Sequence, residues 1–217
     1  SQQRLIIEEL ATHQLSLLKT KKARKSKTTN KFKIKTNLHN NLLISLNFDL
    51  TEAQSRCIRE IHEDLSNTEP MLRLLQGDVG SGKTIVAVFS LIQAVENDFQ
   101  TAVMAPTEIL ARQHLQNFTE YLNPLSIQIA FLSGSQNTQE RREQLELIES
   151  GKAKVIIGTH ALFQESVNFN NLSLVIIDEQ HKFGVHQRLS LSQKANKTPH
   201  QLVMTATPIP RSLTMSA

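Results

Sequence analysis

Residues 71–97 read MLRLLQGDVGSGKTIVAVFSLIQAVEN and contain a short apolar run, a glycine-rich stretch and a long amphipathic segment, in that order. The run at 71–76 has the length of a strand, and the segment that starts at Lys83 is long enough for a helix. The stretch GDVGSGKT (77–84) joins the two. The sequence therefore predicts a strand, a tight loop and a helix at this position.

The same alternation continues to the end of the chain. Five further short apolar runs follow, separated in most cases by stretches long enough for a helix: TAVMAP (101–106), IQIAFL (127–132), KVIIGT (154–159), LVIID (174–178) and QLVMTA (201–206). Nearly continuous apolar strands that alternate with helices indicate a buried parallel sheet with helices on both faces. We therefore predict an α/β fold, with a three-layer α/β/α arrangement around a mostly parallel sheet.

The region before this pattern has a different character. Residues 4–18, RLIIEELATHQLSLL, have the apolar spacing of an amphipathic helix. Residues 19–35 hold nine Lys and Arg and no acid, although the whole chain has a net charge of only +4. We expect a first region, 1–46, made of an N-terminal helix and an exposed basic linker, and a layered domain over 47–217. The linker either contacts nucleic acid phosphates or is a solvated, mobile tether.

Composition limits the class of protein. The 217 residues suit one domain with an appendage, and 39% apolar residues can form a real core. The single cysteine, Cys57, excludes an internal disulfide and fits a reducing compartment. No run of eighteen apolar residues and no signal-peptide layout is present. We expect a soluble, cytoplasmic protein without a membrane segment.

Polar or glycine-rich residues follow five of the six predicted strands. In sheets of this kind, binding and catalytic residues lie at the carboxyl ends of the strands. We therefore expect five short stretches to meet at one edge: GDVGSGKT (77–84), PTE (106–108), GTH (158–160), DEQH (178–181) and TAT (205–207).

The first stretch matches the pattern G-x-x-x-x-G-K-[ST] and predicts a phosphate-binding loop. Its backbone N–H groups can point inward at phosphate oxygens, and the following helix adds its positive end. Lys83 would reach the β- and γ-phosphates, and the Thr84 hydroxyl would coordinate Mg²⁺. A chance glycine-rich turn is disfavoured by the strand before it and the helix after it. The expected nucleotide contacts are Gly77, Asp78, Val79, Gly80, Ser81, Gly82, Lys83 and Thr84.

Two adjacent acids end the fifth apolar run. Asp178 can hold Mg²⁺ through its water shell, and Glu179 can orient or deprotonate an attacking water, which is most of what phosphoryl transfer requires. Surface carboxylates are common at strand ends, so the phosphate loop is what favours this interpretation. We expect the loop and the acids to face each other across neighbouring strand ends and to share one Mg²⁺–ATP.

Together these stretches resemble a known group of proteins. GDVGSGKT, APTEIL, GTHALFQ, DEQHKFGV and TATPIP resemble the first motor lobe of superfamily 2 helicases and translocases, and FDLTEAQ resembles their adenine motif. Within that group the chain is most similar, over residues 4–217, to the RecG family, which remodels branched DNA and stalled replication forks. Lys182 is one departure, because the family usually has Arg there.

The resemblance implies a function and its alternatives. It implies a RecA-like, ATP-binding lobe of a DNA helicase that acts in recombination and repair. A double-stranded DNA translocase of the transcription-repair coupling type, a nucleotide switch without hydrolysis and an RNA helicase remain alternatives. The resemblance also implies a second lobe with an arginine finger, which we do not find here. We therefore expect weak ATP binding, very slow hydrolysis and no unwinding by this chain alone. We also expect the protein to be a monomer.

The resemblance also implies roles for single residues. Phe48 would stack on adenine and Gln54 would read its edge, unless Phe48 is a core residue and Gln54 a plain helix-surface residue. His181, with Gln180 beside it, would link the γ-phosphate to the DNA side and act with the catalytic residues. The hydroxyls of the TAT stretch would couple nucleotide state to DNA, unless they only cap a strand end: Thr205 and Thr207.

Two strand ends would hold a DNA backbone without reading its sequence. Thr107 and the N–H groups of the helix that it opens can bind a phosphate, although simple capping by Thr107 would need the same geometry. The expected DNA contacts are Pro106, Thr107, Glu108, Gly158, Thr159 and His160.

Overall fold

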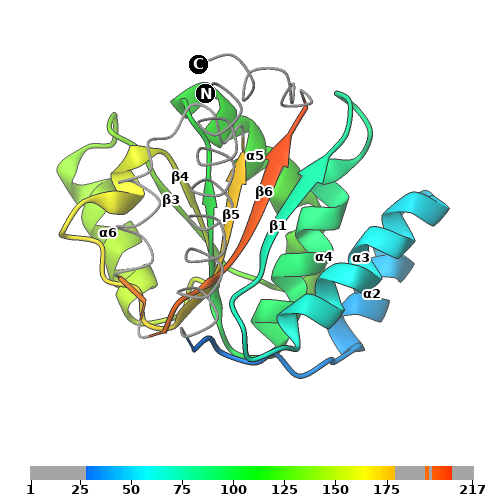
Figure 1. The fold of residues 1–217 in the computed structure, drawn as a ribbon. Helices are drawn as coiled ribbons and strands as arrows, with labels where there is room; N and C mark the ends of the chain where they lie inside the picture. The colour runs from blue at the N-terminus through cyan, green and yellow to red at the C-terminus, as the bar shows by residue number, and fades with distance from the viewer. Residues whose placement is uncertain (1–27, 179–193, 196, 207–217) are drawn as a thin grey trace, which may run out of the picture.

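The fold is a single parallel sheet between two layers of helices (Figure 1). The computed structural model describes residues 28–178, 194–195 and 197–206. All strand pairs are parallel, and the strand order is β1-β6-β5-β2-β4-β3. The six predicted strands are confirmed as β1 (Leu72–Gln76), β2 (Gln100–Met104), β3 (Ile129–Leu132), β4 (Val155–Gly158), β5 (Leu172–Asp178) and β6 (His200–Thr205).

The side chains of each strand alternate between two cores, because successive strand residues point to opposite faces. Val103 and Ile157 belong to one apolar cluster, whereas their neighbours Met104 and Ile156 belong to the other. The described helices of the first face are α2 (Asn37–Ser45), α3 (Glu52–Leu65), α4 (Lys83–Glu96) and α5 (Glu108–Leu122). The second face holds α6 (Thr138–Glu149) and the 3-10 turn η2 (His160–Phe163). The predicted three-layer arrangement is thus confirmed.

None of the helices in the described part of the chain is both long and apolar enough to cross a membrane. The predicted helix at 4–18 lies outside the described residues, and the division of the chain at residue 46 stays a prediction.

Residues 28–35 pack against the domain through Thr29 and Phe32, although five of these eight residues are exposed, as the sequence suggested. Phe32 is buried, and its ring centroid lies 5.0 Å from that of Phe99. The Phe32 N–H donates to the carbonyl of Leu65, 3.0 Å away. The lysines on either side of Phe32 remain exposed, whereas the phenylalanine fills the core. We call residues 28–35 the strap.

The strap is fixed to the amino ends of β5 and β6. His200 is fully buried: its Nδ1 accepts from the Met71 N–H, and its Nε2–H donates to the Asn30 carbonyl. The Asn30 side chain donates to Ser173 Oγ over 2.7 Å. Burial lowers the pKa of His200, and the two hydrogen bonds require the neutral ring. The strap therefore anchors the two strands whose opposite ends carry predicted site residues.

Candidate nucleotide-binding site

Three strand ends meet where the sequence predicts the phosphate site. Gln76 of β1 lies opposite Thr205 of β6, and Asp178 of β5 lies opposite Met204. The glycine-rich loop and the acid are therefore not on neighbouring strands as expected, because β6 runs between them. The Gly77 N–H donates to the Thr205 carbonyl over 3.3 Å, so the backbone of the TAT stretch directly supports the start of the loop.

The loop at residues 77–84 has a shape that favours glycine at two positions. Gly80 and Gly82 have φ angles of +82° and +79°, in the left-handed region that other residues rarely adopt. A Cβ on Gly82 would lie 2.2 Å from the side-chain nitrogen of Gln54. Val79, at the rim, is 90% exposed. The loop is thus open to solvent on one side and closed by Gln54 on the other.

Lys83 reaches back across the loop. Its ammonium donates to the carbonyls of Gly77, over 2.6 Å, and Asp78, over 2.8 Å. Thr84 follows it in the first turn of α4 and lines the adjoining pocket. The cation and the positive end of α4 lie together at the loop, which makes this corner attractive to anions.

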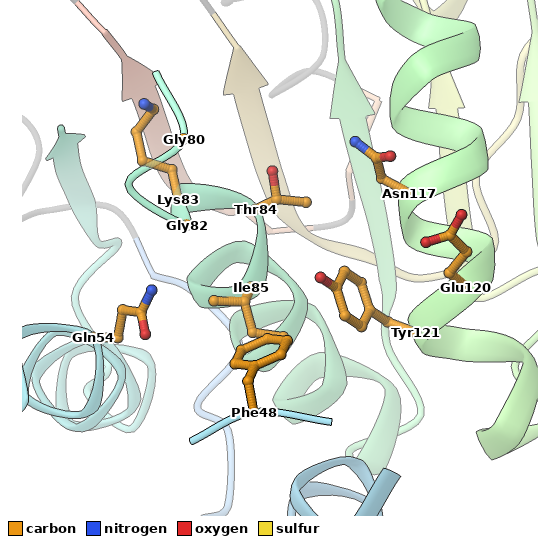
Figure 2. A pocket seen from close by; sticks show the side chains of 10 residues that line it. All are labelled: Phe48, Gln54, Gly80, Gly82, Lys83, Thr84, Ile85, Asn117, Glu120 and Tyr121. Atoms are coloured by element: carbon orange, nitrogen blue, oxygen red, sulfur yellow. The ribbon is translucent and has the colours of Figure 1, made fainter. Parts of the chain in front are cut away.

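A pocket of about 450 Å³ opens beside the loop (Figure 2). Figure 2 shows Phe48, Ile85 and Tyr121 at one end of it and Thr84 nearer the loop. Phe48 is 49% exposed and is therefore not a core residue. Such a volume is in the range of small-molecule sites. The apolar end suits a flat ring, and the polar end suits phosphates.

Gln54 connects the loop to helix α3. It forms a capping box with Thr51. The Gln54 Oε1 accepts from the backbone N–H of Thr51, and the backbone N–H of Gln54 donates to the Thr51 hydroxyl. Its Nε2 donates to the carbonyl of Ser81 over 3.2 Å. Both ends of the amide are thus held by the protein, so reading a base would require an exchange of partners or a bifurcated bond.

Helix α5 contributes pocket residues that the sequence reasoning missed. Asn117, Glu120 and Tyr121 line the pocket from the side opposite Gln54 (Figure 2). Their spacing of three and four residues puts them on one helical face. This spacing is the one feature of the sequence that could have indicated the three pocket residues, but it occurs in amphipathic helices of any function.

Asp178 has a partner that the sequence reasoning also missed. His114 Nε2 lies 2.7 Å from Asp178 Oδ2, and the two side chains are 11% and 15% exposed. The other ring nitrogen, Nδ1, is buried, and no hydrogen-bond partner for it lies among the described residues. The His114 and Phe118 rings are 5.9 Å apart. The carboxylate is therefore held from α5.

The predicted DNA contacts at the start of α5 have internal partners. The Thr107 hydroxyl caps the helix by accepting from the Leu110 N–H over 3.4 Å, although Thr107 stays exposed. Glu108 accepts from the Ser135 hydroxyl and from Arg112, which lower its pKa and keep it ionised. Pro106 precedes the cap. This end of α5 thus presents a hydroxyl and the first helical N–H groups beside an ionised acid whose charge is offset by Arg112.

At the end of β4, packing explains two of the three predicted DNA contacts. A Cβ on Gly158 would lie 2.3 Å from the Leu132 carbonyl, so the close approach of the strands requires glycine. Thr159 is only 3% exposed. His160 is exposed and can contact a ligand directly.

Four predicted site residues lie outside the described residues: Glu179, Gln180, His181 and Thr207. Within the described ranges there is no cluster of three or more His, Cys, Asp or Glu side chains suited to a metal ion. A Mg²⁺ ion needs no such cluster when phosphates and water supply most of its ligands.

Comparisons with known proteins agree with the fold and the loop. A model of the DEAD/DEAH box helicase family matches residues 51–216. The chain is 50% identical over 220 residues to the ATP-dependent DNA helicase RecG of Escherichia coli (strain K12), and 48% identical over 219 residues to RecG of Haemophilus influenzae. Each alignment covers 100% of this chain and 32% of the relative. The chain thus spans about a third of the length of these relatives.

A solved structure of RecG bound to a three-way DNA junction superposes with a TM-score of 0.83 and 44% sequence identity, over 96% of this chain and 28% of that one. The family match includes the loop, the pocket helices and all six strands. This chain therefore belongs to the DEAD/DEAH box helicase family.

Proposed function

We propose that this chain is the ATP-binding motor lobe of a DNA helicase that couples ATP hydrolysis to remodelling of branched DNA and stalled replication forks. The observation that carries the nucleotide part is the meeting of three strand ends, with the Gly77–Thr205 bond joining the loop to the strand beside Asp178. The DNA part is supported by the similarity along the whole chain to RecG helicases, one of which was solved on a three-way junction.

The loop would hold the phosphate chain. The left-handed glycines turn the backbone so that successive N–H groups can face one anion. Lys83 now donates to two loop carbonyls, and a phosphate oxygen in the same place would offer its ammonium a charged acceptor instead. The exchange would need a rotation of the Lys83 side chain.

Thr84 and Asp178 would hold Mg²⁺ between them, with phosphates and water as the remaining ligands. Bound Mg²⁺ would neutralise charge that develops on the transferring phosphate. Glu179 would orient the attacking water, and His181 and Gln180 would connect this chemistry to the DNA side. Thr205 is buried between the loop and Asp178, which suits a role in sensing the nucleotide; Thr207 would act with it.

The base would lie at the apolar end of the pocket. Phe48 is exposed and free to stack on a ring, and Tyr121 faces the same space (Figure 2). Gln54 would read the base edge after releasing one of its present partners. This arrangement favours ATP as the nucleotide.

DNA would lie along the exposed start of α5 and His160, held through its backbone and without sequence preference. Thr107 and the first N–H groups of α5 would contact phosphate, and Arg112 would offset the charge of Glu108. Cytoplasmic location and a monomeric state stay predictions.

The deciding test is ATP hydrolysis by the full-length natural protein without DNA, with single strands, with duplex and with a model fork. We expect the fork to stimulate turnover most, and Glu179→Gln to abolish turnover while nucleotide still binds. Equal stimulation by plain duplex would favour a translocase of the transcription-repair coupling type. Unchanged turnover in the Glu179→Gln protein would contradict the proposed role of that acid.

A further inference from the structure

His114 lies on the part of α5 that faces the sheet. Ala111, His114 and Phe118 follow one another at the spacing of a single helical face, and the first and last are fully buried. A polar ring among apolar neighbours requires a hydrogen-bond partner. That partner is Asp178, which lies 64 positions later in the sequence.

The chemistry of the two groups fixes the direction of their bond. An ionised carboxylate only accepts, so His114 Nε2 carries the proton and donates to Oδ2 over 2.7 Å. A buried Nδ1 without a partner in the described part of the chain is less costly as a bare lone pair than as a second N–H. The bond engages one carboxylate oxygen, so Oδ1 can face another ligand.

We infer that His114 is a positioning residue that orients the Asp178 carboxylate toward its metal ion. This inference rests on the proposed function, because it takes Asp178 as a Mg²⁺ ligand. Outer hydrogen bonds of this kind hold a ligating carboxylate in one rotamer, so the ion meets a preformed ligand. The backbone of β5 alone would leave the side chain free to turn, and the contact from α5 removes that freedom.

The test compares three variants of the full-length protein. His114→Leu removes the donor and keeps apolar volume, and His114→Gln keeps an amide N–H that can reach Asp178. Gln116→Ala changes an exposed side chain of the same helix and leaves the buried bond alone. Mn²⁺ binding is followed by electron paramagnetic resonance with a non-hydrolysable ATP analogue, alongside kcat and KM for ATP.

We expect His114→Leu to weaken Mn²⁺ binding by about 10- to 100-fold and to lower kcat, with metal-free affinity for the analogue unchanged. His114→Gln should restore most of the metal affinity, and Gln116→Ala should leave it at the wild-type value. Wild-type metal affinity in His114→Leu, or equal loss in the Leu and Gln variants, would overturn the inference. A wild-type protein that binds no metal–nucleotide would overturn the proposed function as well.

Discussion

The ends of β1 and β5 hold two halves of one candidate site by different means. At β1 the loop of residues 77–84 owes its turn to its own glycines and to a lysine six positions after the residue it contacts, and Gln54 and the Thr205 carbonyl are its contacts from other elements. At β5 the side chain of Asp178 is held by His114, which belongs to another helix. One half is built locally, and the other depends on the packing of the whole sheet.

This difference explains which features the sequence reveals. A local structure has its causes within a few residues, so a short pattern such as G-x-x-x-x-G-K-[ST] can predict it. A tertiary contact has no such pattern.

The largest effect is expected at the centre of the local half. Lys83→Ala removes the only cation that the described loop places across its own carbonyls, and turnover of the full-length protein should fall by at least about 100-fold. Steady-state ATP hydrolysis measures this, with the exposed Lys152→Ala as a matched control. Retention of more than about a tenth of the activity would refute the assigned role.

The two left-handed glycines should differ in their sensitivity. Alanine at either position strains the backbone by about 1–2 kcal/mol, but only at Gly82 does the new methyl group strike Gln54. Gly82→Ala should displace the amide from Ser81 and weaken nucleotide binding about tenfold more than Gly80→Ala. Calorimetric titration with an ATP analogue measures the difference. Equal affinities of the two variants would show that Gln54 does not shape the loop.

Acid should loosen the long-range contacts that buried histidines make. Burial lowers the pKa of His200, as it does for His62 and His39, so the folded state resists protonation that the unfolded chain accepts below about pH 6.5. Stability from these rings is complete above that pH and is lost as the pH falls toward their lowered folded pKa values.

Hydrogen exchange can locate this loss. Between about pH 7 and pH 5, protection should fall first in the elements that these rings join, which include β6 and the strap at His200, and later in α6, whose described hydrogen bonds involve none of the three histidines. A His200→Gln protein should be less stable at neutral pH and should lose part of the pH dependence. Simultaneous loss of protection in β6 and α6 would argue against a separate anchoring role for the strap.

The smallest effect is expected far from both halves. Arg142 and Glu146 form an ion pair along α6, with side chains 75% and 66% exposed. Arg142→Ala should change the free energy of unfolding by no more than about 0.5 kcal/mol in a denaturant titration. A loss above about 1 kcal/mol would mean that the surface of α6 contributes in a way that this contact does not explain.

Sequence reasoning predicted the framework more fully than the site. All six strands, the helix after the loop and the cap at Thr107 follow from apolar runs and local chemistry. The sequence does not predict that β6 lies between β1 and β5, because strand order depends on how distant segments pair. The burial of Phe32 was missed because eight lysines and one arginine dominate the composition of residues 19–35, although its ring packs against Phe99 and His200.

His114 was missed for a related reason. His114 shares one face of α5 with the buried residues Ala111 and Phe118. A histidine at such a position is interpreted as an ordinary core side chain until the aspartate opposite it is known. The same holds for Tyr121, whose place in the pocket depends on how α5 packs beside α4.

The most direct test of the account is the affinity of the full-length protein for a non-hydrolysable ATP analogue, with and without Mg²⁺, in the wild type and in Asp178→Asn. If the loop binds phosphate by itself and Asp178 serves the metal ion, both proteins will bind equally without Mg²⁺. Only the wild type will then bind more tightly when Mg²⁺ is added. An Asp178→Asn protein that gains as much from Mg²⁺ as the wild type would contradict the division of the site into these two halves.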